Sequence, residues 1–109
     1  MSEKFFRLSD KNTFEKLLTV SKERPVVVFK HSNACPISSR AYREMEKLEN
    51  VNLIEVQLAR DVSAEVATFT GVEHETPQVI VLRDGKAVWN ASHYDVNAGA
   101  VTKAVEANS

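Results

Sequence analysis

The chain contains one cysteine, Cys35, in the sequence Cys35-Pro36-Ile37-Ser38. A proline such as Pro36 is favoured at the first position of a helix, where its missing N–H costs nothing, so the pattern predicts Cys35 as the N-cap. Unpaired backbone N–H groups at a helix start stabilise an anion and favour the thiolate form of a cysteine. The predicted chemistry is attack of this thiolate on a disulfide. The competing interpretation is an inert packing residue, because free cysteines are often buried.

Ser38 occupies the position of the second cysteine in a Cys-x-x-Cys pattern. A hydroxyl cannot attack a mixed disulfide and expel a thiolate, so an external thiol must release Cys35. The sequence therefore predicts monothiol chemistry. Two roles for Ser38 remain open at this stage: it donates a hydrogen bond to the Cys35 thiolate, or it is a polar residue of the first helical turn.

Two basic residues, Lys30 and His31, precede the cysteine, and the cysteine loop runs from His31 to Ala34. Lys30 and His31 are expected to add positive potential near the thiol. Further along the chain, Thr76-Pro77 directly precedes an apolar run. Only about 5–6% of X-Pro bonds in folded proteins are cis, so sequence position alone favours a trans proline that starts a strand.

The histidines suggest other chemistries. His31, Cys35 and His74 could be imagined as a zinc site, and Cys35 with either histidine as the dyad of a cysteine hydrolase. Their positions do not show the spacing of metal ligands, and no motif indicates an oxyanion hole. We therefore expect neither a bound metal nor hydrolase activity.

Composition narrows the class of protein. The chain has 109 residues, of which 43% are hydrophobic and 27% charged, with a formal net charge of −1. These values predict a single globular domain over residues 1–109 and exclude disordered and fibrous classes. No basic stripe predicts a nucleic-acid partner, and the longest apolar run is too short to span a membrane. Because residues 1–4 lack the apolar region of a signal peptide, we expect a cytosolic protein.

Short strands and helices must position the cysteine. The run at residues 25–30 is apolar without alternation, which is typical of a strand covered on both faces. Asp84-Gly85 predicts a type I′ hairpin turn. Strands are expected at residues 5–8, 25–30, 51–56, 78–83 and 86–91. Helices are expected from a cap at residues 9–10 to about residue 24, from 35 to about 50, around 62–70 with Gly71 as terminator, and after a cap near 95 or 97.

This β-α-β-α-β-α-β-β-α order predicts an α/β protein with a thioredoxin-like fold, in which a mixed sheet of about five strands carries helices on both faces. In open α/β sheets, functional sites lie at the carboxyl ends of the strands. Cys35 follows the strand at residues 25–30 and is expected at such an end.

Three segments, residues 29–38, 74–78 and 84–93, resemble the monothiol bacilliredoxins of the YtxJ type, also called BrxC. The resemblance implies a thioredoxin-like fold and removal of bacillithiol from S-bacillithiolated client proteins, with Cys35 as the nucleophile and no bound cofactor. It also implies a cis Thr76-Pro77 bond beside the cysteine, where the backbone pairs with substrate. Free bacillithiol would be the second thiol, and a separate NADPH-dependent reductase would recycle its disulfide. The family usually has threonine where this chain has Ala34.

One alternative from another class remains open. A thioredoxin-like domain can bind a partner without redox turnover, in which case Cys35 is a packing residue or a target of modification. The two functions differ in the reactivity that they require of the thiol.

Overall fold

Five strands form one mixed sheet in the computed structural model, which describes residues 5–34 and 36–109. The sheet order is β1-β3-β2-β4-β5. Strands β1, β3 and β2 run parallel, whereas β4 is antiparallel to both β2 and β5. The strands are β1 (Phe5–Arg7), β2 (Val26–His31), β3 (Val51–Glu55), β4 (Gln78–Arg83) and β5 (Lys86–Ser92). The predicted fold class is confirmed.

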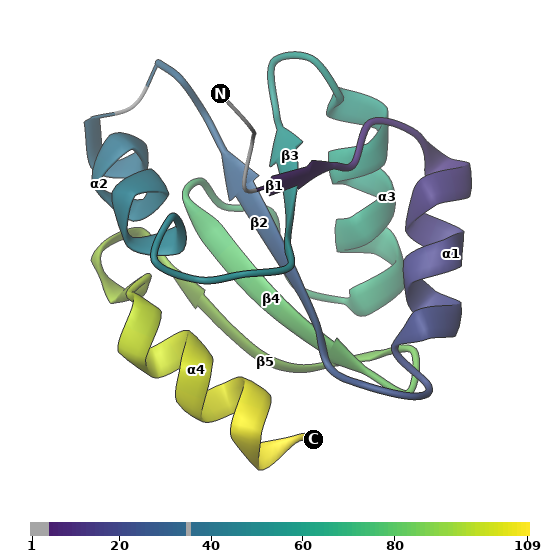
Figure 1. The fold of residues 1–109 in the computed structure, drawn as a ribbon. Coiled ribbons are helices and arrows are strands. Elements are labelled where there is room, and N and C mark those ends of the chain that lie inside the picture. The colour runs from purple at the N-terminus through teal and green to yellow at the C-terminus, as the bar shows by residue number, and fades with distance from the viewer. Residues whose placement is uncertain (1–4, 35) are drawn as a thin grey trace.

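Four α-helices cover the two faces of this sheet (Figure 1). Helices α1 and α3 lie on one face, and α2 and α4 on the other. The helices are α1 (Lys11–Val20), α2 (Pro36–Met45), α3 (Arg60–Thr70) and α4 (Ala98–Ala107), and a short 3₁₀ helix, η1 (His93–Asp95), precedes α4. Because side chains alternate along a strand, β2 contributes Val28 to the core under α1 and α3 and Phe29 to the core under α2 and α4. All six residues of β2 are buried. The apolar run predicts this for residues 26–29, whereas Lys30 and His31 are buried although they are polar.

The predicted caps of α1 and α4, the predicted end of α3 and the predicted hairpin turn are found. Asp10 caps α1 by accepting a hydrogen bond from the Thr13 N–H, and Asn97 caps α4 in the same way. Gly71 ends α3 with a φ of 74°, in the left-handed region. Asp84 and Gly85 have φ values of 56° and 73°, as a type I′ turn requires at both central positions.

Three predicted boundaries were wrong. Helix α1 ends at Val20 rather than near Arg24, because the chain passes into tight turns before Pro25, which cannot continue a helix. Helix α2 ends at Met45 rather than near Asn50, and i→i+3 hydrogen bonds follow it. His31 was expected in the loop but is the last residue of β2, since its register with β3 continues to the last residue of that strand.

Candidate active site at the carboxyl end of β2

The cysteine loop joins β2 to α2 at the carboxyl end of the strand (Figure 1). Strand β2 ends at His31 and α2 begins at Pro36, so the cysteine directly precedes the first helical residue. Cys35 itself lies outside the described residues, and its predicted roles as N-cap and nucleophile stay predictions. Its neighbours Ala34 and Pro36 are both exposed, so the chain on either side of the cysteine reaches the surface.

Ser38 connects the two ends of this loop. Its hydroxyl lies 2.9 Å from Nδ1 of His31 and accepts a hydrogen bond of 3.0 Å from the Ser32 N–H. Ser38 is fully buried, and His31 is only 8% exposed. Ser38 therefore binds both the last residue of β2, His31, and the residue that follows it, Ser32. Ile37, the other predicted motif residue, is half-buried.

The loop between β3 and α3 supports the same segment from the other side. The side-chain amide of Gln57 donates a hydrogen bond of 2.7 Å to Oγ of Ser32, and the Val56 N–H donates one of 2.9 Å to the His31 carbonyl. Gln57 was not predicted from the sequence. Its signal would have been the parallel pairing of β2 and β3, which brings the residues after both strands to the same end of the sheet.

His31 contributes a polar ring rather than the expected positive charge. Burial lowers the pKa of His31, and this effect outweighs the opposing influences of Glu55 and Ser38. The imidazole is therefore mostly neutral near pH 7. Its ring lies 4.9 Å from that of Tyr42, centroid to centroid, and both residues line a pocket of about 250 Å³ with Ser39 and Arg43.

Lys30 extends to the opposite face of the sheet. Its ammonium Nζ donates hydrogen bonds to the Ser63 carbonyl at 3.1 Å and to Nδ1 of His74 at 3.2 Å. Ser63 belongs to α3 and His74 to the segment that precedes β4. Burial lowers the pKa of Lys30 to about 8, so the amine remains mostly protonated near pH 7. Lys30 and His31, which were both expected to add positive potential near the thiol, point to opposite faces of the sheet.

The Thr76-Pro77 bond is cis, which confirms what the resemblance implies and not what sequence position alone favours. Pro77 is buried, and its carbonyl accepts a hydrogen bond of 2.8 Å from the His93 N–H. Because Gln78 pairs with Lys30, Thr76 and Pro77 lie at the carboxyl end of β2, where the cysteine loop begins. Thr76 and Pro77 therefore lie at the end of the sheet where the cysteine loop begins, and their role in binding substrate stays a prediction.

Two further observations concern residues 5–34 and 36–109. No group of three or more His, Cys, Asp or Glu residues there could hold a metal ion, and none of the helices is long and apolar enough to cross a membrane. His31 and His74 lie on opposite faces of β2, since His31 bonds to Ser38 whereas His74 bonds to Lys30.

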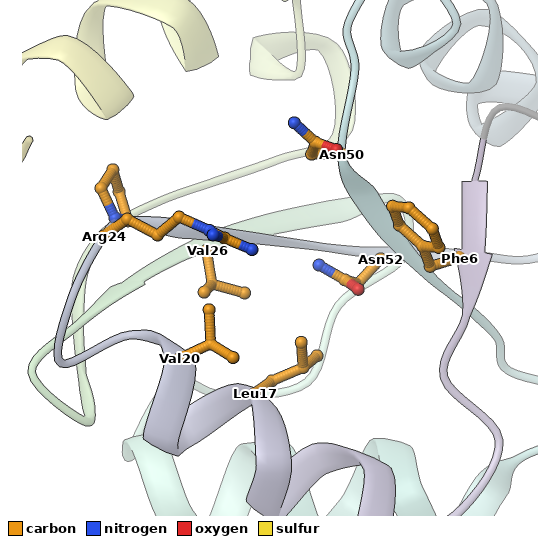
Figure 2. A pocket seen from close by; sticks show the side chains of 8 residues that line it. Phe6, Leu17, Val20, Arg24, Val26, Asn50 and Asn52 are labelled. Carbon is orange, nitrogen blue, oxygen red and sulfur yellow. The ribbon is translucent and has the colours of Figure 1, made fainter.

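A pocket of about 330 Å³ lies away from the cysteine loop, where α1 ends and β2 begins (Figure 2). Leu17, Val20 and Val26 form much of its apolar lining. Among its polar residues, Asn52 already donates its amide to the Val27 carbonyl at 3.0 Å. This pocket therefore offers apolar volume but no evident reactive group.

Replacing Ser38 by alanine is expected to destabilise the fold by roughly 1–3 kcal/mol, because it leaves His31 Nδ1 and the Ser32 N–H without the buried hydroxyl. Ser39→Ala, at the exposed neighbouring position, is the matched control and should change stability by less than about 0.5 kcal/mol. Urea unfolding measures both variants. Equal midpoints would show that the Ser38 hydrogen bonds contribute nothing.

Known structures share the overall fold. A solved structure described as a candidate oxidoreductase with a thioredoxin fold is 34% identical to this chain, with 93% of each chain covered and a TM-score of 0.83. Thioredoxin from Fasciola hepatica is 18% identical over 95% of this chain and 99% of its own, with a TM-score of 0.71. Reduced Schistosoma mansoni thioredoxin is 15% identical over 98% and 100%, also with a TM-score of 0.71. The two thioredoxins, at these identities, show the fold alone.

The family comparison adds chemistry to the fold. The model of the monothiol bacilliredoxin BrxC matches residues 6–101, a span that includes the cysteine loop, the cis proline and the hairpin. The single cysteine fits monothiol chemistry. This match and the thioredoxin fold together place the chain in the monothiol bacilliredoxin family of thiol-disulfide oxidoreductases.

Proposed function

We propose that the protein removes bacillithiol from S-bacillithiolated client proteins through a mixed disulfide on Cys35. The observation that carries this proposal is a single cysteine directly before the first residue of α2 in a chain of the monothiol bacilliredoxin family. A thiol at that position is favoured as a thiolate, and the thiolate is the attacking species in disulfide exchange.

The proposed reaction has two exchange steps. The Cys35 thiolate attacks the bacillithiol sulfur of the client's mixed disulfide, forming the Cys35–bacillithiol disulfide and releasing the client cysteine as a thiolate. A second bacillithiol thiolate then attacks this disulfide, giving bacillithiol disulfide and regenerating the Cys35 thiolate. A separate NADPH-dependent reductase returns bacillithiol disulfide to two thiols, so this protein needs no bound cofactor.

The surroundings of Ser38 support resolution by an external thiol. The residue at the second position of the Cys-x-x-Cys pattern is a hydroxyl that contacts His31 and Ser32, and the chain has no further cysteine. An intramolecular second step therefore has no thiol to perform it. We assign the reaction to the cytosol, a reducing compartment in which a free cysteine persists.

Intact-protein mass spectrometry tests the proposal. The reduced protein is mixed with an S-bacillithiolated model protein and, separately, with the same protein glutathionylated. We expect the mass of bacillithiol to appear on this chain while the model protein becomes a free thiol, with much slower transfer of glutathione. Addition of free bacillithiol should then restore the reduced chain. Equal transfer of both thiols would refute selectivity for bacillithiol, and no transfer of either would refute the proposed activity.

A further inference from the structure

A buried ammonium group with no counterion among the described residues lies against α3. Lys30 has no solvent exposure, and no carboxylate in the described part of the chain lies within ion-pair distance of its Nζ. Its two recorded acceptors, the Ser63 carbonyl and His74 Nδ1, are both uncharged. Burying an unpaired charge is costly, so a ligand that brought negative charge to this group would be favoured.

Ser63 and His74, the two residues that contact Lys30 Nζ, form part of the wall of a pocket of about 410 Å³. Arg60, the first residue of α3, also lines the pocket and makes no ion pair with any described residue. Among the described residues, no aspartate or glutamate lines it. The remaining lining residues are small or apolar: Val56, Ala64, Ala67 and Thr68. The pocket thus combines positive charge with an apolar wall.

The hydrogen bonds of His74 fix which ring nitrogen faces a ligand. A lysine ammonium can only donate hydrogen bonds. Nδ1 of His74 must therefore be unprotonated to accept the hydrogen bond from Lys30. Ser63 Oγ contacts the same nitrogen at 3.1 Å. In the neutral ring the proton is therefore on Nε2, which makes no recorded hydrogen bond within the described residues. His74 is exposed, so Nε2–H is available as a donor with the Lys30 charge behind it.

We propose that this pocket binds an organic carboxylate, which accepts hydrogen bonds from His74 Nε2–H and the Arg60 guanidinium while Lys30 supplies the balancing charge. A carboxylate suits both donors, since charge-assisted hydrogen bonds are stronger than neutral ones. The described lining residues offer no oxygen cluster for a metal ion and no carboxylate for a cationic ligand.

The pocket adjoins the cysteine loop through backbone contacts. Val56 lines the pocket and bonds to the His31 carbonyl, and the next residue, Gln57, bonds to Ser32. His74 precedes the cis Thr76-Pro77 pair by two residues. The identity of the carboxylate rests on the proposed function. Under that function, it is the carboxylate of the bacillithiol that the substrate carries. The pocket would then hold the acidic part of the small thiol while its sulfur meets Cys35.

Titration of the full-length Cys35→Ser protein tests the pocket without any disulfide chemistry. Succinate, its uncharged dimethyl ester and reduced bacillithiol are each added at constant ionic strength, and backbone amide NMR shifts are recorded. We expect succinate and bacillithiol to cause saturable shifts centred on Arg60, Ser63 and His74, and the ester to cause none. Absence of saturable shifts there with succinate would overturn the pocket. Shifts with succinate but not with bacillithiol would overturn the assignment to the thiol.

Two variants and a matched control complete the test. Arg60→Gln and His74→Gln should each weaken succinate binding by about tenfold, the usual effect of losing a hydrogen bond to a charged group. Arg24→Gln makes the same change of charge beside the distant pocket of Figure 2 and should leave binding unchanged. Equal affinities in all three variants would overturn the proposal. Bacillithiol transfer with no carboxylate binding would refute this pocket alone, whereas binding without transfer would refute only the proposed function.

Discussion

Replacing Cys35 by serine is expected to abolish bacillithiol transfer, lowering its rate by more than about a thousandfold. The chain has no other cysteine, so no second thiol can take over the attack. A serine hydroxyl is not ionised near neutral pH and does not displace a thiolate from a disulfide. Release of the model protein's free thiol, followed over time by mass spectrometry, measures the effect. Full activity in Cys35→Ser would remove the basis of the proposed mechanism.

A relocated thiol is the sharpest control for this variant. The double variant Cys35→Ser with Ser39→Cys keeps one thiol in the chain but places it at an exposed position within α2, beyond the first turn. It should exchange only at the slow rate of an ordinary exposed thiol, since helix-start stabilisation falls off within the first turn. If the double variant exchanged as fast as the wild type, the position of Cys35 before α2 would not increase the rate of exchange.

Lys30→Met is expected to raise the free energy of unfolding near pH 7 by about 1–4 kcal/mol, the range seen when buried charges are replaced by apolar groups. The methionine removes an ammonium that is fully buried without a carboxylate partner among the described residues. It leaves few orphaned groups, because His74 Nδ1 keeps its contact with Ser63 Oγ. Urea unfolding of both proteins at pH 7 measures the difference.

The stability difference between the two proteins should shrink as the pH rises. The pKa of Lys30 is about 8 in the folded state, against 10.5 for an exposed lysine. Between these values the unfolded chain binds more protons, so the stability of the wild type rises with pH, by about 3 kcal/mol in all. Below pH 8 both states hold the proton and the cost of the buried charge is fully present. Comparison with Lys30→Met cancels the other groups that titrate at alkaline pH.

Two outcomes would contradict this account of Lys30. A stability difference that stays constant from pH 7 to 10.5 would show that the ammonium is not perturbed by burial. A strongly destabilised Lys30→Met protein would show that the contacts with Ser63 and His74 outweigh the cost of the charge. Leu17→Met, on the apolar face of α1, is a suitable control for the side chain introduced.

Most of the fold could be predicted from local patterns. The unbroken apolar run of β2, the Asp84-Gly85 turn and the cap at Asn97 each have a local physical cause that the sequence displays. Helix ends were less predictable. The turns after Val20 and Met45 contain hydrogen bonds between residues three apart, whereas an α-helix joins residues four apart, and the sequence does not display this difference. The cis Thr76-Pro77 bond was accessible only through the family resemblance.

The candidate site was predicted in its location but not in its contacts. The helix-start position of Pro36 and the strand before it indicated where the cysteine loop lies. The hydrogen bonds of Gln57 and His74 depend on segments that are distant in the chain and meet only through the sheet. One further feature could have been predicted. Side chains alternate along a strand, so the neighbours Lys30 and His31 must point to opposite faces of the sheet.

The two-sided character of β2 also has an evolutionary consequence. Lys30 and His31 are neighbours in the chain, yet one depends on α3 and the segment before β4, whereas the other depends on α2. Substitutions at position 30 should therefore correlate across relatives with those at positions 63 and 74, and substitutions at position 31 with those at position 38. Adjacent positions 30 and 31 should vary independently of each other. One strand would thus allow the ligand preference of the domain to diverge while the hydroxyl network around the cysteine loop is retained.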